Sequence, residues 1–200
     1  MNAAVRLREL EEEYQGRVEL EWKSFLLRPE RRVHRDREAA LEKFRSYTKG
    51  WQRIGAEPDA GEFETWHSDE GPPSHSVPAH VASKAAARLG KHAFERIHAR
   101  LLRAYFQESR DVSHPAVLRE LWLEVGLDAE AFPDLEDTAL IDEIVADHRE
   151  ALELGATGVP AVRLEDNPAV IVGAHPVELY RRWIERTLER RDDAPEPAAK

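Results

Sequence analysis

The stretch that decides the fold is TGVPAVRLEDNPAVIV, residues 157–172. Within it, two short apolar runs at 161–164 and 169–172 are separated only by a polar turn that contains Pro168. So short a link between two apolar runs predicts an antiparallel hairpin of two strands. A last helix is predicted from Pro176 to about residue 191, because proline is well suited to the first turn of a helix.

Towards the amino terminus, the sequence predicts a helix followed by a strand. Apolar residues recur at helical spacing from Ala3 to Tyr14, and Gly16 ends the pattern. Residues 18–23 then alternate between apolar and charged side chains. This period of two predicts a strand with one face exposed to solvent.

The chain between these two ends is predicted to be helical. Residues 57–78 are the exception, because their prolines and glycines predict a long irregular connection. A short helix is expected after Asp128, which can cap it. The longer predicted helices span residues 39–54, 79–89, 91–107, 115–126 and 135–154.

The order helix, strand, helical block, hairpin, helix indicates an α/β fold with a large all-helical insertion. We expect residues 1–33 and 156–191 to form the α/β domain and residues 34–155 to form the insertion. Residues 192–200 are polar and rich in proline, which predicts a disordered tail.

Composition limits the partners and the chemistry. The formal net charge of −10 argues against nucleic acid or an anionic membrane as the main partner, because both would be repelled. No apolar run is long enough for a membrane span and no signal-peptide pattern is present, so the cytoplasm is the expected location. The chain has no cysteine, which excludes disulfides, zinc–thiolate sites and a cysteine nucleophile within it.

Three segments together resemble the DsbA-like branch of thioredoxin-fold proteins, over roughly residues 3–190. They are the Thr157–Pro160 turn before the hairpin, the segment EWKSFLLRPE at 21–30, and residues 103–128 of the helical block. The branch includes FrnE-type oxidoreductases and 2-hydroxychromene-2-carboxylate isomerases. The resemblance implies a thioredoxin-like fold and an ancestral thiol–disulfide oxidoreductase activity. It also implies a cis Pro160 whose turn, Thr157, Gly158, Val159 and Pro160, binds substrate.

The chain departs from this branch at its start. Members of the branch open with a strand and a Cys-x-x-Cys motif, or a serine variant, before the first helix. Here the first helix begins almost at Met1, and we expect Asn2 to act only as its cap. We therefore expect the first strand to be missing, no catalytic residue to be present and the chain as given to be redox-inactive. A start assigned too late explains this most simply; a decayed gene or a strand supplied by another chain are alternatives.

The function therefore stays open between three classes. The first is the oxidoreductase ancestry, with a protein thiol or disulfide as partner. The second is a glutathione-dependent isomerase, in which glutathione is a substrate or co-substrate bound at Val159 and Pro160, with no resident cofactor. The third is a non-catalytic peptide-binding or scaffold protein that accepts a strand at an open sheet edge. The sequence does not set the substrate or the oligomeric state.

Three further groups of residues are candidates for a function. Phe25, Leu26 and Leu27 could form one wall of a substrate groove, but core packing is the favoured interpretation. Arg163 lies in a predicted strand, where it would face either the vacant strand position or solvent. Histidines are the third group, and they are expected to be surface residues, without a metal site; those closest to acids or to one another are His67, His75, His80 and His148.

Overall fold

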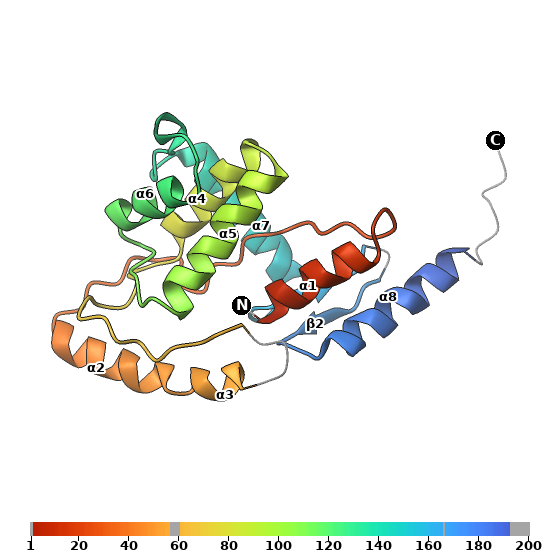
Figure 1. The fold of residues 1–200 in the computed structure, drawn as a ribbon, viewed down its shortest axis with the longest axis horizontal. Coiled ribbons are helices and arrows are strands. Elements are labelled where there is room, and N and C mark those ends of the chain that lie inside the picture. The colour runs from red at the N-terminus through yellow and green to blue at the C-terminus, as the bar shows by residue number, and fades with distance from the viewer. Residues whose placement is uncertain (1, 57–60, 166, 193–200) are drawn as a thin grey trace. The chain divides into compact units, whose positions relative to one another are not determined.

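The computed structural model describes residues 2–56, 61–165 and 167–192 (Figure 1). These residues form two compact units. One unit is continuous in sequence and spans Trp22–Ala151. The other combines Asn2–Glu21 with the chain from Leu152 onward. The α/β class with a helical insertion, predicted from the sequence, is confirmed.

The discontinuous unit is the α/β part of the molecule. Its elements are α1 (Asn2–Glu13), β1 (Ala161–Arg163), β2 (Val170–Val172) and α8 (Val177–Asp192). Helix α1 packs against α8, although they lie at opposite ends of the chain. Their core contains Leu10 of α1 and a stripe of α8 at helical spacing: Val177, Tyr180, Ile184 and Leu188. Asp192 is the last residue of α8, and the rest of the predicted tail lies outside the described residues.

The predicted hairpin is confirmed. Strands β1 and β2 pair antiparallel, with Val162 opposite Ile171 at the centre of the register. Arg163 closes the turn: its guanidinium donates to the carbonyl oxygens of Glu165 at 3.1 Å and Asn167 at 3.3 Å. The exposed Arg163 side chain therefore stabilises the hairpin turn through local hydrogen bonds.

The strand predicted over residues 18–23 is wrong. These residues form no strand in the structure. The Val18 N–H donates to the Tyr14 carbonyl oxygen, and the Leu20 N–H donates to the Glu11 carboxylate at 3.0 Å. Alternation of apolar and charged residues suits a strand with one buried face. A strand also needs hydrogen bonds to a neighbouring strand, and a local sequence pattern does not supply that neighbour.

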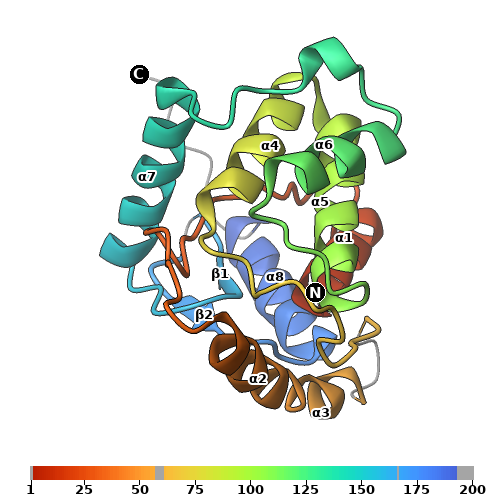
Figure 2. The same cartoon turned by 90° about the vertical axis from the view of Figure 1, so that its left-hand side faces the viewer.

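The continuous unit is helical (Figure 2). Its elements are α2 (Arg37–Thr48), α3 (Trp51–Gly55), α4 (Val77–Arg88), α5 (Lys91–Phe106), α6 (Pro115–Glu124), the 3₁₀ turn η1 (Ala129–Ala131) and most of α7 (Thr138–Glu153). Helices α4, α5 and α6 pack on one another around fully buried Ile97, Leu118 and Trp122. Asp128 caps η1 as predicted, since its carboxylate accepts from the Glu130 N–H at 2.9 Å.

The single helix predicted over residues 39–54 is in fact two helices. Helix α2 ends at Thr48, and α3 begins only at Trp51. Glycine at position 50 weakens a helix, and the buried Thr48 hydroxyl both donates to the Arg45 carbonyl oxygen and accepts from the Trp66 N–H, each at 3.0 Å. Trp66 belongs to the irregular connection, so the last residue of α2 is bonded to a residue remote in sequence. Aromatic rings of Phe44, Trp51 and Trp66 pack together at this corner.

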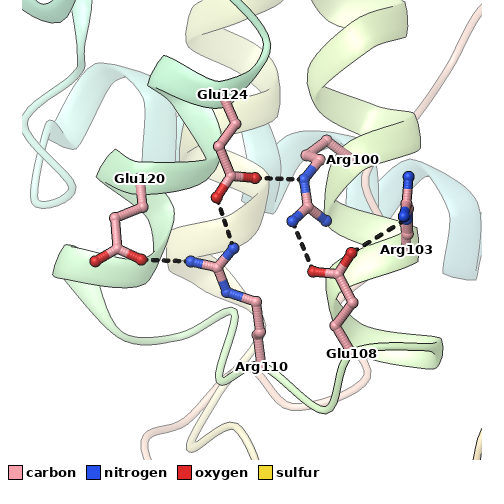
Figure 3. A network of polar contacts seen from close by, with 6 residues as sticks. All are labelled: Arg100, Arg103, Glu108, Arg110, Glu120 and Glu124. Atoms are coloured by element: carbon pink, nitrogen blue, oxygen red, sulfur yellow. Dashed lines mark hydrogen bonds and ion pairs between the residues drawn. The ribbon is translucent and has the colours of Figure 1, made fainter.

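A network of arginines and glutamates joins α5, α6 and the loop between them (Figure 3). Arg100 of α5 contacts both Glu108 and Glu124, each at 2.6 Å. Arg110 in the loop pairs with Glu124 at 2.9 Å and with Glu120. Burial raises the pKa of Glu124, but the hydrogen bonds from Arg110 and Arg100 outweigh it, so the pKa lies below its usual value. The network holds the α5–α6 loop against both helices.

The described residues contain neither a helix suited to span a membrane nor a cluster of metal ligands. In these residues no helix combines the length and apolar composition needed to cross a bilayer. Within the same ranges, no three His, Asp or Glu side chains converge as metal ligands would.

Thr48→Val should destabilise the helical unit by about 1–3 kcal/mol, because the buried Trp66 N–H loses its acceptor while side-chain volume is kept. Thr48→Ser, which retains the hydroxyl, should recover most of that loss. Urea unfolding followed by tryptophan fluorescence measures both variants. Equal stability of the Val and wild-type proteins would contradict this role for the hydroxyl.

Candidate functional site

The Thr157–Pro160 turn leads from α7 into β1 and is presented on the surface of the α/β unit. Ala156 before it is buried, whereas Thr157 is exposed and Val159 keeps 50% of its surface exposed. The peptide bond between Val159 and Pro160 is cis. The four residues expected to bind substrate therefore form one continuous, accessible turn.

The backbone of this turn has unused hydrogen-bonding capacity. Within the part of the chain that the structure describes, the N–H and C=O groups of Thr157, Gly158 and Val159 form no hydrogen bond. A main-chain amide is a strong donor and acceptor that is normally paired with protein or water. The turn can therefore pair with the backbone of a ligand.

The carbonyl of Pro160 fixes the turn to the end of the hairpin. It accepts the Gly173 N–H at 2.8 Å. Gly173 has φ +101°, a conformation that side-chain-bearing residues rarely adopt. The Gly173 carbonyl oxygen in turn accepts from the Tyr180 hydroxyl at 3.1 Å. Gly173 thus connects the turn to the core of the α/β unit.

Tyr180 and Arg6 complete the support. The Tyr180 hydroxyl accepts from the His175 N–H at 3.4 Å, and burial raises the Tyr180 pKa. Arg6 of α1 is 3% exposed and donates from Nη1 to the His175 carbonyl oxygen at 2.8 Å. Sequence reasoning missed Arg6, Gly173, His175 and Tyr180 as supports. The only available signal was Gly173, which interrupts the pattern after the second strand.

The arrangement supports binding and orientation, but no thiol chemistry. A thiolate is the nucleophile in disulfide exchange, and the chain has no cysteine. The turn supplies a fixed backbone edge and an exposed apolar side chain at Val159.

The candidate segment Phe25–Leu27 divides between core and surface. Leu26 is buried with Val81 and Ile144, which confirms the core interpretation for that residue. Leu27 is 62% exposed and so does not belong to the core. The half-buried Phe25 ring meets the His148 ring edge-on at a centroid distance of 4.8 Å.

Helices α4 and α7 hold the backbone of this segment. The Ser24 N–H donates to Asp147 at 2.8 Å, and the Leu26 N–H donates to Nδ1 of His148 at 3.3 Å. Lys84 of α4 pairs with the same Asp147 carboxylate at 2.6 Å. These contacts explain why residues 22–33 belong to the helical unit, whereas the sequence suggested grouping them with the α/β domain.

The four candidate histidines differ in their surroundings. His80 is half-buried, and burial lowers its pKa to about 4, against the opposing effects of a hydrogen bond with the Phe25 backbone and the Asp147 charge. It is therefore not the surface residue expected from the sequence. His67 is exposed and His75 is half-buried; their rings lie within hydrogen-bonding distance of Ser109 and Ser74, respectively.

The chain matches a known family model over most of its length. Residues 1–185 match the family model described as a DSBA-like thioredoxin domain. The chain belongs to the DsbA-like thioredoxin family. The helical unit and the turn before the hairpin therefore belong to a DsbA-like thioredoxin domain that lacks cysteine.

Solved structures show the same DsbA-like fold. A candidate protein disulfide isomerase from Nitrosomonas europaea is 18% identical with a TM-score of 0.72, covering 94% of this chain and 91% of that chain. The cytosolic disulfide reductase DsbM from Pseudomonas aeruginosa is 22% identical with a TM-score of 0.71, covering 94% and 93%. A second DsbM structure, with GSH, has a TM-score of 0.68 at the same identity and coverage.

Tyr180→Phe should cost about 1–2 kcal/mol of stability in the α/β unit, because the Gly173 carbonyl loses its buried donor. The matched control is Tyr14→Phe, whose hydroxyl bonds to Glu185 at an exposed position and should cost under about 0.5 kcal/mol. Thermal unfolding measures both variants. If the two substitutions cost the same, the Tyr180 hydroxyl does not support the turn.

The His80 environment predicts a pH dependence of stability. Because the folded-state pKa of about 4 lies below the usual 6.5, the unfolded state binds more protons between these values. This contribution to stability is complete above pH 6.5 and is lost as the pH falls towards 4. His80→Gln should flatten the pH dependence over that window in urea unfolding. His34→Gln, at an exposed histidine, should leave it unchanged, and an unaltered slope in His80→Gln would contradict the assignment.

Proposed function

We propose that the Thr157–Pro160 turn is the substrate-binding half of a thiol–disulfide oxidoreductase site. The chain as given then binds a disulfide-containing peptide or glutathione without exchanging thiols. The observation that carries this proposal is the exposed turn, whose main-chain groups at 157–159 form no hydrogen bond among the described residues. Membership of the DsbA-like family supports the same assignment.

Binding would use the backbone first. The Val159 N–H and C=O can pair with an extended peptide as a neighbouring strand would, which is the geometry of β-augmentation. The exposed Val159 side chain adds apolar contact, and Gly173 holds the turn in place through Pro160. Glutathione offers a peptide-like backbone, and one of the structures with this fold is described as containing GSH.

Thiol exchange would need a cysteine from outside these 200 residues. We propose that a strand with the Cys-x-x-Cys motif of the FrnE-type branch supplies it. The coding DNA before Met1 tests this. An in-frame segment that encodes such a strand and motif supports the proposal, and an immediate in-frame stop contradicts it.

The proposed location is the cytoplasm, where thiols are kept reduced. One protein of the same fold is described as a cytosolic disulfide reductase, which supports this proposal. Fractionation of cells that express the protein with its native upstream sequence tests it, and recovery in a secreted or periplasmic fraction would contradict it.

Glutathione disulfide and reduced glutathione should bind the turn with millimolar dissociation constants, since a small ligand held by few contacts gains only about 4 kcal/mol. In a titration of ¹⁵N-labelled protein, the largest amide shifts should fall on Gly158, Val159 and Ala161. Val159→Glu should weaken binding several-fold, because glutathione is a net anion.

Val145→Glu is the matched control, since Val145 is an exposed valine of α7 in the helical unit. It should leave the affinity unchanged. Shifts confined to residues outside 156–173, or no shift with either form, would contradict the proposed site. Binding of reduced glutathione alone, with no response to its disulfide, would favour the glutathione-dependent isomerase class.

A further inference from the structure

Arginines are concentrated in one short loop of this acidic chain. Residues 28–37 read RPERRVHRDR and hold five arginines and His34 against only Glu30 and Asp36, whereas the whole chain carries a net charge of −10. We refer to residues 28–37 as the arginine loop. It lies in the helical unit and leads into α2.

The backbone of the arginine loop is fixed at both ends. At its start, the Ser76 N–H donates to the Arg28 carbonyl oxygen at 2.8 Å, and the Arg32 N–H donates to the Ser74 carbonyl oxygen at 3.1 Å. At its end, the Asp36 carboxylate accepts from the Ala39 N–H at 2.9 Å and caps α2. The loop therefore presents its side chains from a defined backbone.

Most of these arginines point charge into solvent. Arg28 is committed to the fold, since it donates to the Pro73 carbonyl oxygen and lies over the Phe44 ring. Arg31, Arg32 and Arg35 are exposed, and among the described residues they form no ion pair. Elsewhere in the same unit arginines are paired with carboxylates, as Arg100 and Arg110 are (Figure 3).

The arginine loop also contains one exposed apolar residue, Val33, between Arg32 and His34. Val33 is 85% exposed, the largest exposed fraction among the exposed large apolar residues. His75, on the segment that pairs with the loop, has its pKa lowered by burial and then by the Arg31 charge, so it stays neutral beside the arginines near pH 7. A ligand that covered this surface would gain both ion pairs and apolar contact. Arginine is suited to this because its planar fork binds carboxylates with two hydrogen bonds.

We propose that the arginine loop is a docking surface for a short acidic peptide segment of a partner protein, one with an apolar residue among its carboxylates. A short acidic peptide is favoured over a nucleic acid or an anionic membrane because those polyanions are much larger than the arginine loop. Those polyanions would run on across the remaining, strongly acidic surface and be repelled, whereas a short peptide needs only local complementarity. This surface is independent of the Thr157–Pro160 turn, which belongs to the other unit.

Fluorescence anisotropy with a labelled Glu-Glu-Leu-Glu-Glu peptide tests the proposal. At about 10 mM salt, where exposed charges act over ~30 Å, the peptide should bind, and its uncharged Gln-Gln-Leu-Gln-Gln counterpart should not. Arg31→Glu/Arg35→Glu should weaken binding at least about tenfold. Val33→Ser should weaken it by a smaller factor, because only apolar contact is lost.

Arg186→Glu/Arg190→Glu is the matched control, since it makes the same change of net charge at exposed arginines of α8. Circular dichroism checks that each variant keeps its helix content. No binding of the acidic peptide, or an equal loss in the control variant, would overturn the proposal. Tighter loop-dependent binding of duplex DNA or of phosphatidylserine vesicles than of the peptide would overturn the choice of partner.

Discussion

The exposed turn depends on one hydrogen bond, from the Gly173 N–H to the Pro160 carbonyl oxygen at 2.8 Å. It closes the open end of a hairpin whose strands are only three residues long. So short a hairpin is not stable alone, and it must be held by packing or by further bonds. The Gly173 carbonyl oxygen accepts from the Tyr180 hydroxyl, which also accepts from the His175 N–H. The His175 carbonyl oxygen in turn accepts from Arg6. The shape of a surface turn is thus set by residues buried on two helices.

Burying Arg6 for this purpose is costly, because a guanidinium loses its hydration when it leaves water. The loss is offset in part by the hydrogen bond that its Nη1 donates to the His175 carbonyl oxygen. An apolar residue at this position would leave the His175 carbonyl oxygen without this donor. The guanidinium of Arg6 therefore serves as a donor that links α1 to the segment before α8. Lys is not an equal substitute in this role.

Local patterns in the sequence were enough to predict the hairpin, the opening and closing helices and the Asp128 cap. Each depends on residues within a few positions of one another. Three features depended on remote partners and could not be found in this way. The strand at 18–23 needed a neighbour, the hydrogen bond at the end of α2 comes from the remote Trp66 N–H, and the buried state of Arg6 follows only from the fold. The position of the Thr157–Pro160 turn was predictable, but the residues that support it were not.

The two proposed surfaces use opposite chemistry. The Thr157–Pro160 turn offers uncharged backbone groups and one apolar side chain, so it should tolerate many peptide sequences. The arginine loop offers charge on a fixed backbone, so it should select by charge and act mainly on the rate of encounter at low salt. A protein with both surfaces can select a partner by charge at the arginine loop and bind the main chain of that partner at the Thr157–Pro160 turn.

The division of the chain has a consequence for biosynthesis. The helical unit is one uninterrupted segment, so it can fold as soon as residue 151 has left the ribosome. Helix α1 is made before the helical unit, but it can pack on Tyr180, Ile184 and Leu188 only after these later residues have been made. Until then its apolar face is uncovered and must be protected by transient contacts or by chaperones. A pause in translation after residue 151 would therefore prolong the time during which the apolar face of α1 is uncovered.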